Sequence, residues 1–217
     1  MKRISLIVPC LNEEEAIPAF KQEIDRVFKE CLEGYAPELI FVDDGSTDRS
    51  LEMIKKMAEH SPEVKFISFS RNFGKEAAIY AGLEAATGDY AAVMDVDLQD
   101  PPSLLPDMLK AIEKEGYDCA GTRRVTRQGE PLLRSFFARV FYKTIHQISD
   151  TRIVDGARDY KLMTRPVLEA LLSLKEYNRF SKGLYEWVGF RTKWFEYENV
   201  ERVAGETKWS FFKLFLY

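Results

Sequence analysis

The strongest constraint on the fold is an alternation of two hydrophobic patterns along the first half of the chain. Short apolar runs bounded by turn-forming residues predict strands, whereas apolar residues at intervals of three and four predict helices with one buried face. Strands and helices that alternate in this way normally build a largely parallel sheet with helices on both faces, so we predict an α/β fold. The predicted strands cover residues 4–9, 39–42, 64–69, 90–94 and 118–121, and the predicted helices cover 17–31, 51–57, 76–86 and 102–115.

The second half of the chain is less regular. We predict helices over residues 132–148 and 166–174 and a strand over 191–197. No internal repeat or low-complexity linker divides the 217 residues, which are enough to bury one large core. Charge is uneven, because residues 1–116 carry 13 basic and 23 acidic side chains and the rest carry 18 and 12. An acidic half suits a metal and a basic half suits phosphate or an anionic membrane, although ordinary surface charge explains the asymmetry equally well.

Polar clusters follow four of the predicted strands. Ligands of open α/β sheets bind beyond the carboxyl ends of the strands, where such clusters meet. We therefore expect one binding site built from residues 9–13, 43–46, 70–72 and 95–97.

Asp95 and Asp97 are the most informative residues of these clusters. They follow a buried apolar strand and precede two prolines. Two carboxylates one residue apart on a strand normally point to opposite sides, but a turn of the backbone would let both reach one cation. Carboxylate oxygens suit Mg²⁺ or Mn²⁺, which commonly bridges protein to phosphate. Taken alone, the same pattern is typical of a solvated acidic turn.

Asp43 and Asp44 end another predicted strand and precede Gly45. A carboxylate at this position could accept a hydrogen bond from the imide of a base or from ribose hydroxyls, and glycine permits a tight turn close to a ligand. A turn with a helix cap is one alternative. The phosphate-accepting aspartate of a receiver domain is another, although a receiver does not account for Asp95 and Asp97.

Several other classes of protein are not supported by the sequence. It contains neither the glycine-rich dinucleotide motif, nor the P-loop, nor the nucleophile elbow of α/β hydrolases. His60 and His146 have no metal-binding spacing, and three scattered cysteines favour reduced cytosolic thiols over a disulfide framework. We find no secretory leader and no apolar run of membrane-spanning length. The class that remains is a metal-assisted transfer from a nucleotide-diphosphate donor.

Six motifs stand in order along nearly the whole chain, at residues 8–13, 42–48, 71–75, 95–102, 156–163 and 201–209. Together they resemble glycosyltransferase family 2, and most of all its polyprenyl-phosphate subgroup, which includes dolichyl-phosphate mannose synthase and bacterial bactoprenol glucosyltransferases. The resemblance implies a GT-A fold, that is, a mostly parallel central sheet flanked by helices. It also implies a metal-dependent, inverting transfer to a lipid phosphate. On this basis residues 1–208 form the catalytic domain, with a nucleotide-sugar half at 1–121 and an acceptor half at 122–208.

The resemblance also implies roles for particular residues. The residues expected to contact the donor are Pro9, Leu11, Glu13, Asp43, Asp44 and Lys75. The residues expected to hold Mg²⁺ or Mn²⁺, and through it the diphosphate, are Asp95, Asp97 and Gln99. The acceptor phosphate is expected to meet Arg123, Arg134, Arg202 and Lys208, since the guanidinium fork matches phosphate oxygens. The residues implied to be catalytic are Asp159, Asp97 and Arg202.

Asp159 matches the carboxylate that the family uses for catalysis or for orienting the acceptor. A phosphate acceptor is already ionised near neutral pH, so a strong general base is not required, and Asp159 could instead position other groups. The alternative is a simple ion pair with Arg158 or Lys161.

The donor and the acceptor are less closely defined by the motifs. UDP-glucose is the favoured donor, while UDP-N-acetylglucosamine and GDP-mannose stay open. The Gln-x-x-Arg-Trp motif of processive synthases is absent, which favours transfer of a single sugar. Two rivals are a soluble transferase that acts on a saccharide hydroxyl, which would need a general base, and a non-catalytic nucleotide-sugar-binding subunit.

Residues 209–217 are amphipathic and rich in aromatic side chains. We expect them to begin a juxtamembrane helix at the membrane interface, and we expect a membrane anchor to be missing from this chain. Packing on the domain or on a partner subunit is the alternative. The expected location is the cytoplasmic face of the cell membrane. The expected partners are a nucleotide sugar, a polyprenyl phosphate and the membrane surface, without nucleic acid, and a homo-oligomer is left open.

Overall fold

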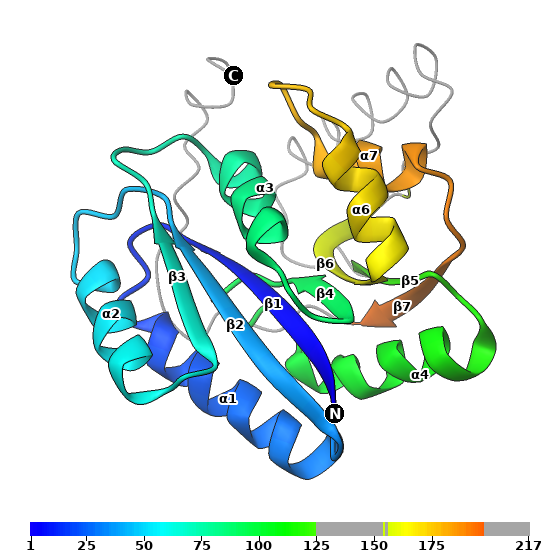
Figure 1. Ribbon diagram of the computed structural model, residues 1–217, viewed down its shortest axis with the longest axis horizontal. Helices are drawn as coiled ribbons and strands as arrows, with labels where there is room; N and C mark the ends of the chain where they lie inside the picture. Colours follow the sequence, from blue (N-terminus) through cyan, green and yellow to red (C-terminus); the bar gives the residue numbers. More distant parts are fainter. Residues whose placement is uncertain (125–153, 155, 198–217) are drawn as a thin grey trace, which may run out of the picture.

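A mixed sheet forms the centre of the computed structural model, which describes residues 1–124, 154 and 156–197 (Figure 1). Within these residues seven strands pair in the order β3-β2-β1-β4-β6-β5-β7. The strands are β1 (Lys2–Cys10), β2 (Tyr35–Asp43), β3 (Val64–Ser68), β4 (Tyr90–Val93), β5 (Cys119–Arg124), β6 (Ala157–Thr164) and β7 (Thr192–Tyr197). The helices are α1 (Ala16–Cys31), α2 (Ser50–His60), α3 (Lys75–Ala85), the short 3₁₀ helix η1 (Pro102–Leu104), α4 (Leu105–Glu115), α6 (Arg165–Ser173) and α7 (Ser181–Trp187).

Most neighbouring strands in the sheet are parallel. β1 pairs in parallel with β2 and β4, β2 with β3, and β5 with β7. β6 is the exception, because it runs antiparallel to β4 on one side and to β5 on the other. The beginning of β6 therefore lies at the same edge of the sheet as the ends of β1, β2 and β4. The predicted, mostly parallel sheet is confirmed.

Helices cover both faces of the sheet (Figure 1). Along β1, Leu6 faces a core built with α1, α2 and α4, whereas Ile7 faces a core built with α3, α6 and α7. This division follows from the strand period of two, which sends successive side chains to opposite faces. Both residues are fully buried, as expected for a strand covered on both sides. No helix in the described ranges combines the length and the apolar character needed to cross a membrane.

The predicted elements of the first half are confirmed, with small shifts of their ends, and α6 and β7 match the helix and the strand predicted later in the chain. Two elements were not predicted. β6 carries charged residues at Arg158, Asp159 and Lys161, so it lacks the apolar run that signals a buried strand. α7 is only seven residues long, too short for a clear helical period. The helix predicted over 132–148 lies outside the described residues.

Candidate active site

The loops that follow β1 and β2 are joined at the carboxyl edge of the sheet. The Asn12 backbone N–H donates to Ser46 Oγ at 2.9 Å, and the Thr47 N–H donates to Asn12 Oδ1 at 2.7 Å. The Asp44 N–H donates to the Cys10 carbonyl at 2.8 Å. Two of the polar clusters expected to share one site are therefore in direct contact.

Asp43 and Asp44 differ sharply in what their carboxylates do. Asp44 Oδ1 accepts from the Phe73 N–H at 2.7 Å and Oδ2 accepts from the Gly74 N–H at 3.0 Å, so this side chain fastens the loop before α3. Burial raises the pKa of Asp44 above its ordinary value. Asp43 is also buried, but its Oδ1 has no hydrogen-bond partner in the described part of the chain. Asp43 thus presents an acceptor oxygen of the kind that a base or ribose could satisfy.

Gly45 allows this close arrangement. Its φ is +74°, and a Cβ atom at this position would lie 2.5 Å from the Arg71 carbonyl carbon and 2.7 Å from the Asn72 nitrogen. Any side chain would therefore push the loop after β2 away from the loop after β3.

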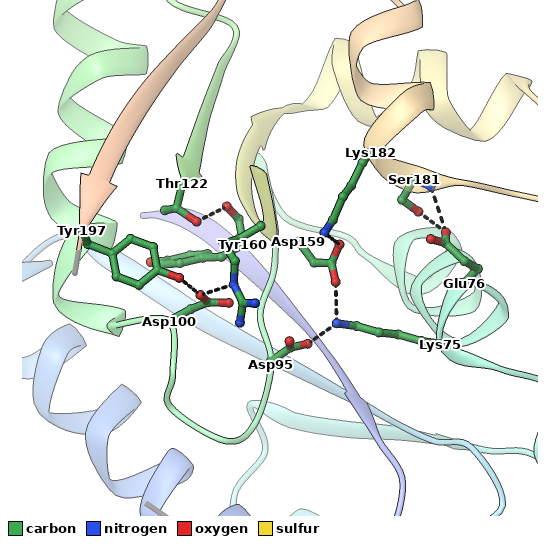
Figure 2. A network of polar contacts seen from close by, with 11 residues as sticks. Lys75, Glu76, Asp95, Asp100, Thr122, Asp159, Tyr160, Ser181, Lys182 and Tyr197 are labelled. Carbon is green, nitrogen blue, oxygen red and sulfur yellow. Dashed lines mark hydrogen bonds and ion pairs between the residues drawn. The ribbon is translucent and has the colours of Figure 1, made fainter. Parts of the chain in front are cut away.

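Lys75 joins the strand-end aspartate to the beginning of β6 (Figure 2). Its Nζ lies 2.6 Å from Asp95 Oδ1 and 2.5 Å from Asp159 Oδ2. Lys182 Nζ lies 3.8 Å from the other oxygen, Asp159 Oδ1. Burial by itself would raise the pKa of Asp159, but the two ammonium groups outweigh it and hold that pKa well below the usual range. Asp159 is therefore a carboxylate at any physiological pH.

The start of α7 is held over Asp159 by a second contact (Figure 2). Glu76, next to Lys75 on α3, accepts hydrogen bonds from the Ser181 N–H at 3.0 Å and from the Ser181 hydroxyl. Because Lys182 follows Ser181, this contact holds the backbone that carries Lys182 close to Asp159.

The alternative prediction for Asp159, an ion pair with Arg158 or Lys161, is wrong. Arg158 pairs instead with Asp100, with Nε donating to Oδ1 at 3.0 Å. Lys161 pairs with Glu186 at 3.2 Å on the other face of β6 from Arg158. Alternation along the strand explains why Arg158 does not pair with Asp159, since these neighbours point to opposite faces.

Asp97 and Gln99 lie in the loop between β4 and η1. Asp97 is buried, and its Oδ1 accepts from the Gln99 N–H at 3.1 Å. Leu98 between them has a φ of +57°, so the backbone turns sharply after Asp97. Asp95, Asp97 and Gln99 offer hard oxygen atoms that fit Mg²⁺ or Mn²⁺. Among the described residues no group of three or more His, Cys, Asp or Glu side chains that could hold a metal ion is found. An ion held by Asp95, Asp97 and Gln99 would complete its coordination with phosphate and water.

Asp100 is a site residue that the sequence reasoning missed. It is buried, and its Oδ1 accepts from both Arg158 and the Tyr197 hydroxyl (Figure 2). Its Oδ2 has no hydrogen-bond partner in the described ranges. The available signal was its place directly after the Asp95–Gln99 cluster, but an aspartate before two prolines is also an ordinary loop residue.

The other predicted residues divide into three groups. Pro9 is the second-to-last residue of β1, Leu11 directly follows the strand, and the Glu13 N–H donates to Ser50 Oγ at 2.8 Å, so these residues lie where the donor was expected. Arg123 near the end of β5 is paired with Glu196 of β7. Three predicted residues, Arg134, Arg202 and Lys208, lie outside the described residues, as do the domain end at 208 and the tail 209–217.

Comparisons with known sequences agree with the motifs. The family model described as Glycosyl transferase family 2 matches residues 5–172. CsbB of Bacillus subtilis is 45% identical over 214 residues, which cover 99% of this chain and 64% of CsbB. The prophage bactoprenol glucosyl transferase homolog of Escherichia coli is 42% identical over 98% of this chain and 68% of its own length. The chain thus spans about two thirds of the length of these relatives.

Comparisons with solved structures concern the fold, since their sequence identities are low. The mannosyltransferase PcManGT from Pyrobaculum calidifontis, in complex with GDP-Man and Mn²⁺, has a TM-score of 0.60 at 22% identity, over 94% of this chain and 57% of that one. Glucosyl-3-phosphoglycerate synthase from Mycobacterium tuberculosis, with Mn²⁺, UDP-Glc and phosphoglyceric acid, has a TM-score of 0.60 at 21% identity, over 94% and 73% of the two chains. The predicted fold class is confirmed by these neighbours.

Proposed function

The chain belongs to glycosyltransferase family 2 and has its GT-A-like fold, and from this premise we propose that it transfers one sugar from a nucleotide-diphosphate donor to a polyprenyl phosphate. UDP-glucose is the favoured donor, because several relatives near 42% identity carry the name bactoprenol glucosyl transferase. In the reaction, a phosphate oxygen of the acceptor attacks the anomeric carbon. The bond from that carbon to the diphosphate breaks, and the nucleoside diphosphate leaves.

The donor would lie across the ends of β1, β2 and β4. Asp43 has a buried oxygen without a hydrogen-bond partner in the described residues, which suits a base or ribose donor group. Asp95, Asp97 and Gln99 would hold a divalent cation, which when bound stabilises the negative charge on the leaving diphosphate. Two of the solved neighbours carry Mn²⁺ together with a nucleotide sugar, which supports this reading of the cluster.

The geometry around Asp159 supports an acceptor that is already ionised, and this observation carries the proposal. Both oxygens of Asp159 face ammonium groups, from Lys75 at 2.5 Å and from Lys182 at 3.8 Å. A general base works best when its pKa lies near the working pH, whereas the pKa of Asp159 lies well below its ordinary value. Asp159 is therefore poorly suited to activate a neutral saccharide hydroxyl. It is well suited to hold the two lysines that could receive a phosphate.

The proposal is tested by nucleotide release. The purified chain is incubated with UDP-glucose, UDP-N-acetylglucosamine or GDP-mannose, with Mn²⁺ or Mg²⁺, and with or without a short polyprenyl phosphate. We expect release that needs both metal and lipid and is fastest with UDP-glucose. Asp97→Ala should abolish it, while Asp107→Asn, an exposed change on α4, should leave it unchanged. Release with a saccharide acceptor but not with the lipid would favour the rival transferase, and donor binding without any release would favour a non-catalytic subunit.

We also propose that the chain works against the cytoplasmic surface of a membrane. Residues 209–217 are amphipathic and aromatic, as in helices that lie at a membrane interface. Deletion of these residues is expected to reduce pelleting with anionic liposomes while donor binding is retained. Equal pelleting with and without them would contradict this part of the proposal.

A further inference from the structure

Arg158 stands at the junction of the β4–η1 loop and the beginning of β6. It is the second residue of β6 and directly precedes Asp159, so the two side chains lie on opposite faces of the strand. Asp159 meets Lys75 and, through it, Asp95, while Arg158 meets Asp100. The loop that carries Asp95 at one end and Asp100 at the other therefore holds the start of β6 from both faces.

The Arg158 guanidinium is held in one orientation. Its Nε donates at 3.0 Å to Asp100 Oδ1, and the side chain of Asp100 is fully buried. The Tyr197 hydroxyl donates to the same oxygen, so Asp100 is itself oriented from β7 (Figure 2). Burial would lower the pKa of Arg158, but the nearby charges, above all Asp100, outweigh it and raise that pKa further.

The described part of the chain leaves the terminal edge of this guanidinium open to a ligand. Among the described residues, no acceptor is found for its two terminal nitrogens, and 23% of the side chain is exposed. Asp95 is close enough to contribute to its electrostatic environment. A guanidinium that is oriented by a buried carboxylate through one nitrogen, and whose other nitrogens have no partner among the described residues, is arranged to bind a phosphate group through two parallel hydrogen bonds.

We propose that Arg158 is a phosphate-binding residue, held in place by Asp100 and Tyr197. This inference rests on the proposed function, because both substrates of that reaction carry phosphate. The phosphate belongs either to the donor diphosphate or to the acceptor, and the two are separated by direct binding measurements.

The test is calorimetric titration of the whole chain with UDP plus Mn²⁺ in one arm and with a short polyprenyl phosphate in the other. Arg158→Lys keeps the charge and loses the fork. We expect it to weaken binding about 10- to 100-fold in one arm, as for loss of a charge-assisted hydrogen bond, with little change in the other. The titration in which binding weakens shows which substrate carries the phosphate that Arg158 binds. Tyr197→Phe should weaken the same arm by a smaller factor.

The controls separate this role from a structural one. Arg165 lies just past the opposite end of β6, with Nε donating to Glu169 at 3.2 Å, so Arg165→Lys makes the same chemical change away from the site. It should leave both arms unchanged. If Arg158→Lys unfolds the chain, the double change Arg158→Met with Asp100→Asn removes both buried charges and is expected to show the same selective loss.

The outcomes separate a failure of the role of Arg158 from a failure of the proposed function. If the wild type and the folded Arg158 variants bind both probes equally well, the role of Arg158 is overturned, while the proposed function stands. An equal loss in both arms would indicate a general structural effect and would also overturn it. Failure of the wild-type chain to bind either probe would overturn the proposed function and, with it, this inference.

Discussion

The contacts of Glu38 allow its contribution to the free energy of unfolding to be worked out from the structure and measured. Its buried carboxylate accepts hydrogen bonds from Ser5 Oγ at 2.5 Å, Thr87 N at 2.9 Å, Thr87 Oγ1 at 2.6 Å and Lys65 Nζ at 2.6 Å. Burial would raise the pKa of Glu38, but these contacts outweigh it and lower that pKa to about 2. The network ties β1, β2, β3 and the turn before β4 together near the amino ends of β1 and β4.

The magnitude follows from this pKa. The difference between the ordinary value of 4.5 and about 2 corresponds to about 3 kcal/mol of stabilisation of the charged form. Because Lys65 is half exposed, solvent screens part of its contribution, and we expect Glu38→Gln to cost about 2 kcal/mol at pH 7. The pKa is lower in the folded than in the unfolded chain, so this stabilisation is complete above about pH 4.5. It is lost as the pH falls towards 2.

The assay is urea unfolding of the wild type and Glu38→Gln at pH 7 and at pH 3.5. The difference in unfolding free energy should be about 2 kcal/mol at pH 7 and should shrink by about 1 kcal/mol at pH 3.5. Glu52→Gln removes an exposed glutamate paired with Lys56 and should not change stability measurably. A Glu38 variant as stable as the wild type at pH 7, or a difference that does not depend on pH, would refute the reasoning.

Three further changes test the candidate site. Lys75→Met leaves Asp95 and Asp159 without the ammonium group between them. Loss of one charge-assisted hydrogen bond should lower kcat/KM at least about tenfold in the nucleotide-release assay, and Lys75→Arg should restore part of the activity. Gly45→Ala places a Cβ 2.5 Å from backbone atoms and also strains a positive φ, so it should lower the free energy of unfolding by about 3 kcal/mol in thermal or urea unfolding. Gly116→Ala has nearly the same φ but open space around it, and it should lower this free energy by about 1 kcal/mol. Chelation of divalent metal should abolish calorimetric binding of UDP, and added Mn²⁺ should restore it; undiminished binding in chelator would contradict the metal assignment.

Hydrophobic patterns were sufficient to predict the order of most strands and helices. The reason is that β1, β2 and β4 are buried on both faces and read as continuous apolar runs, while α1 and α4 show one apolar face. The parallel arrangement then brings the ends of these strands to one edge, so the edge that carries the candidate site followed from the same patterns. The antiparallel strand β6 was not predicted, because its alternation of charged and apolar residues depends on two faces that only the packed sheet defines.

What the sequence by itself determined is therefore the α/β architecture and the edge at which Asp43, Asp95 and Asp97 gather, since these follow from local periodicity and from strand ends. Only the tertiary structure decided which charges meet. Lys75 and Asp159 are 84 residues apart, and Arg158 and Asp100 are 58 apart. Their pairing depends on how β6 is placed beside β4, and the pleat of β6 sends the adjacent Arg158 and Asp159 to opposite faces of the sheet. Long-range pairing of this kind leaves no periodic trace in a sequence, because each charged side chain has many partners of opposite sign along the chain and the folded backbone brings only a few within reach.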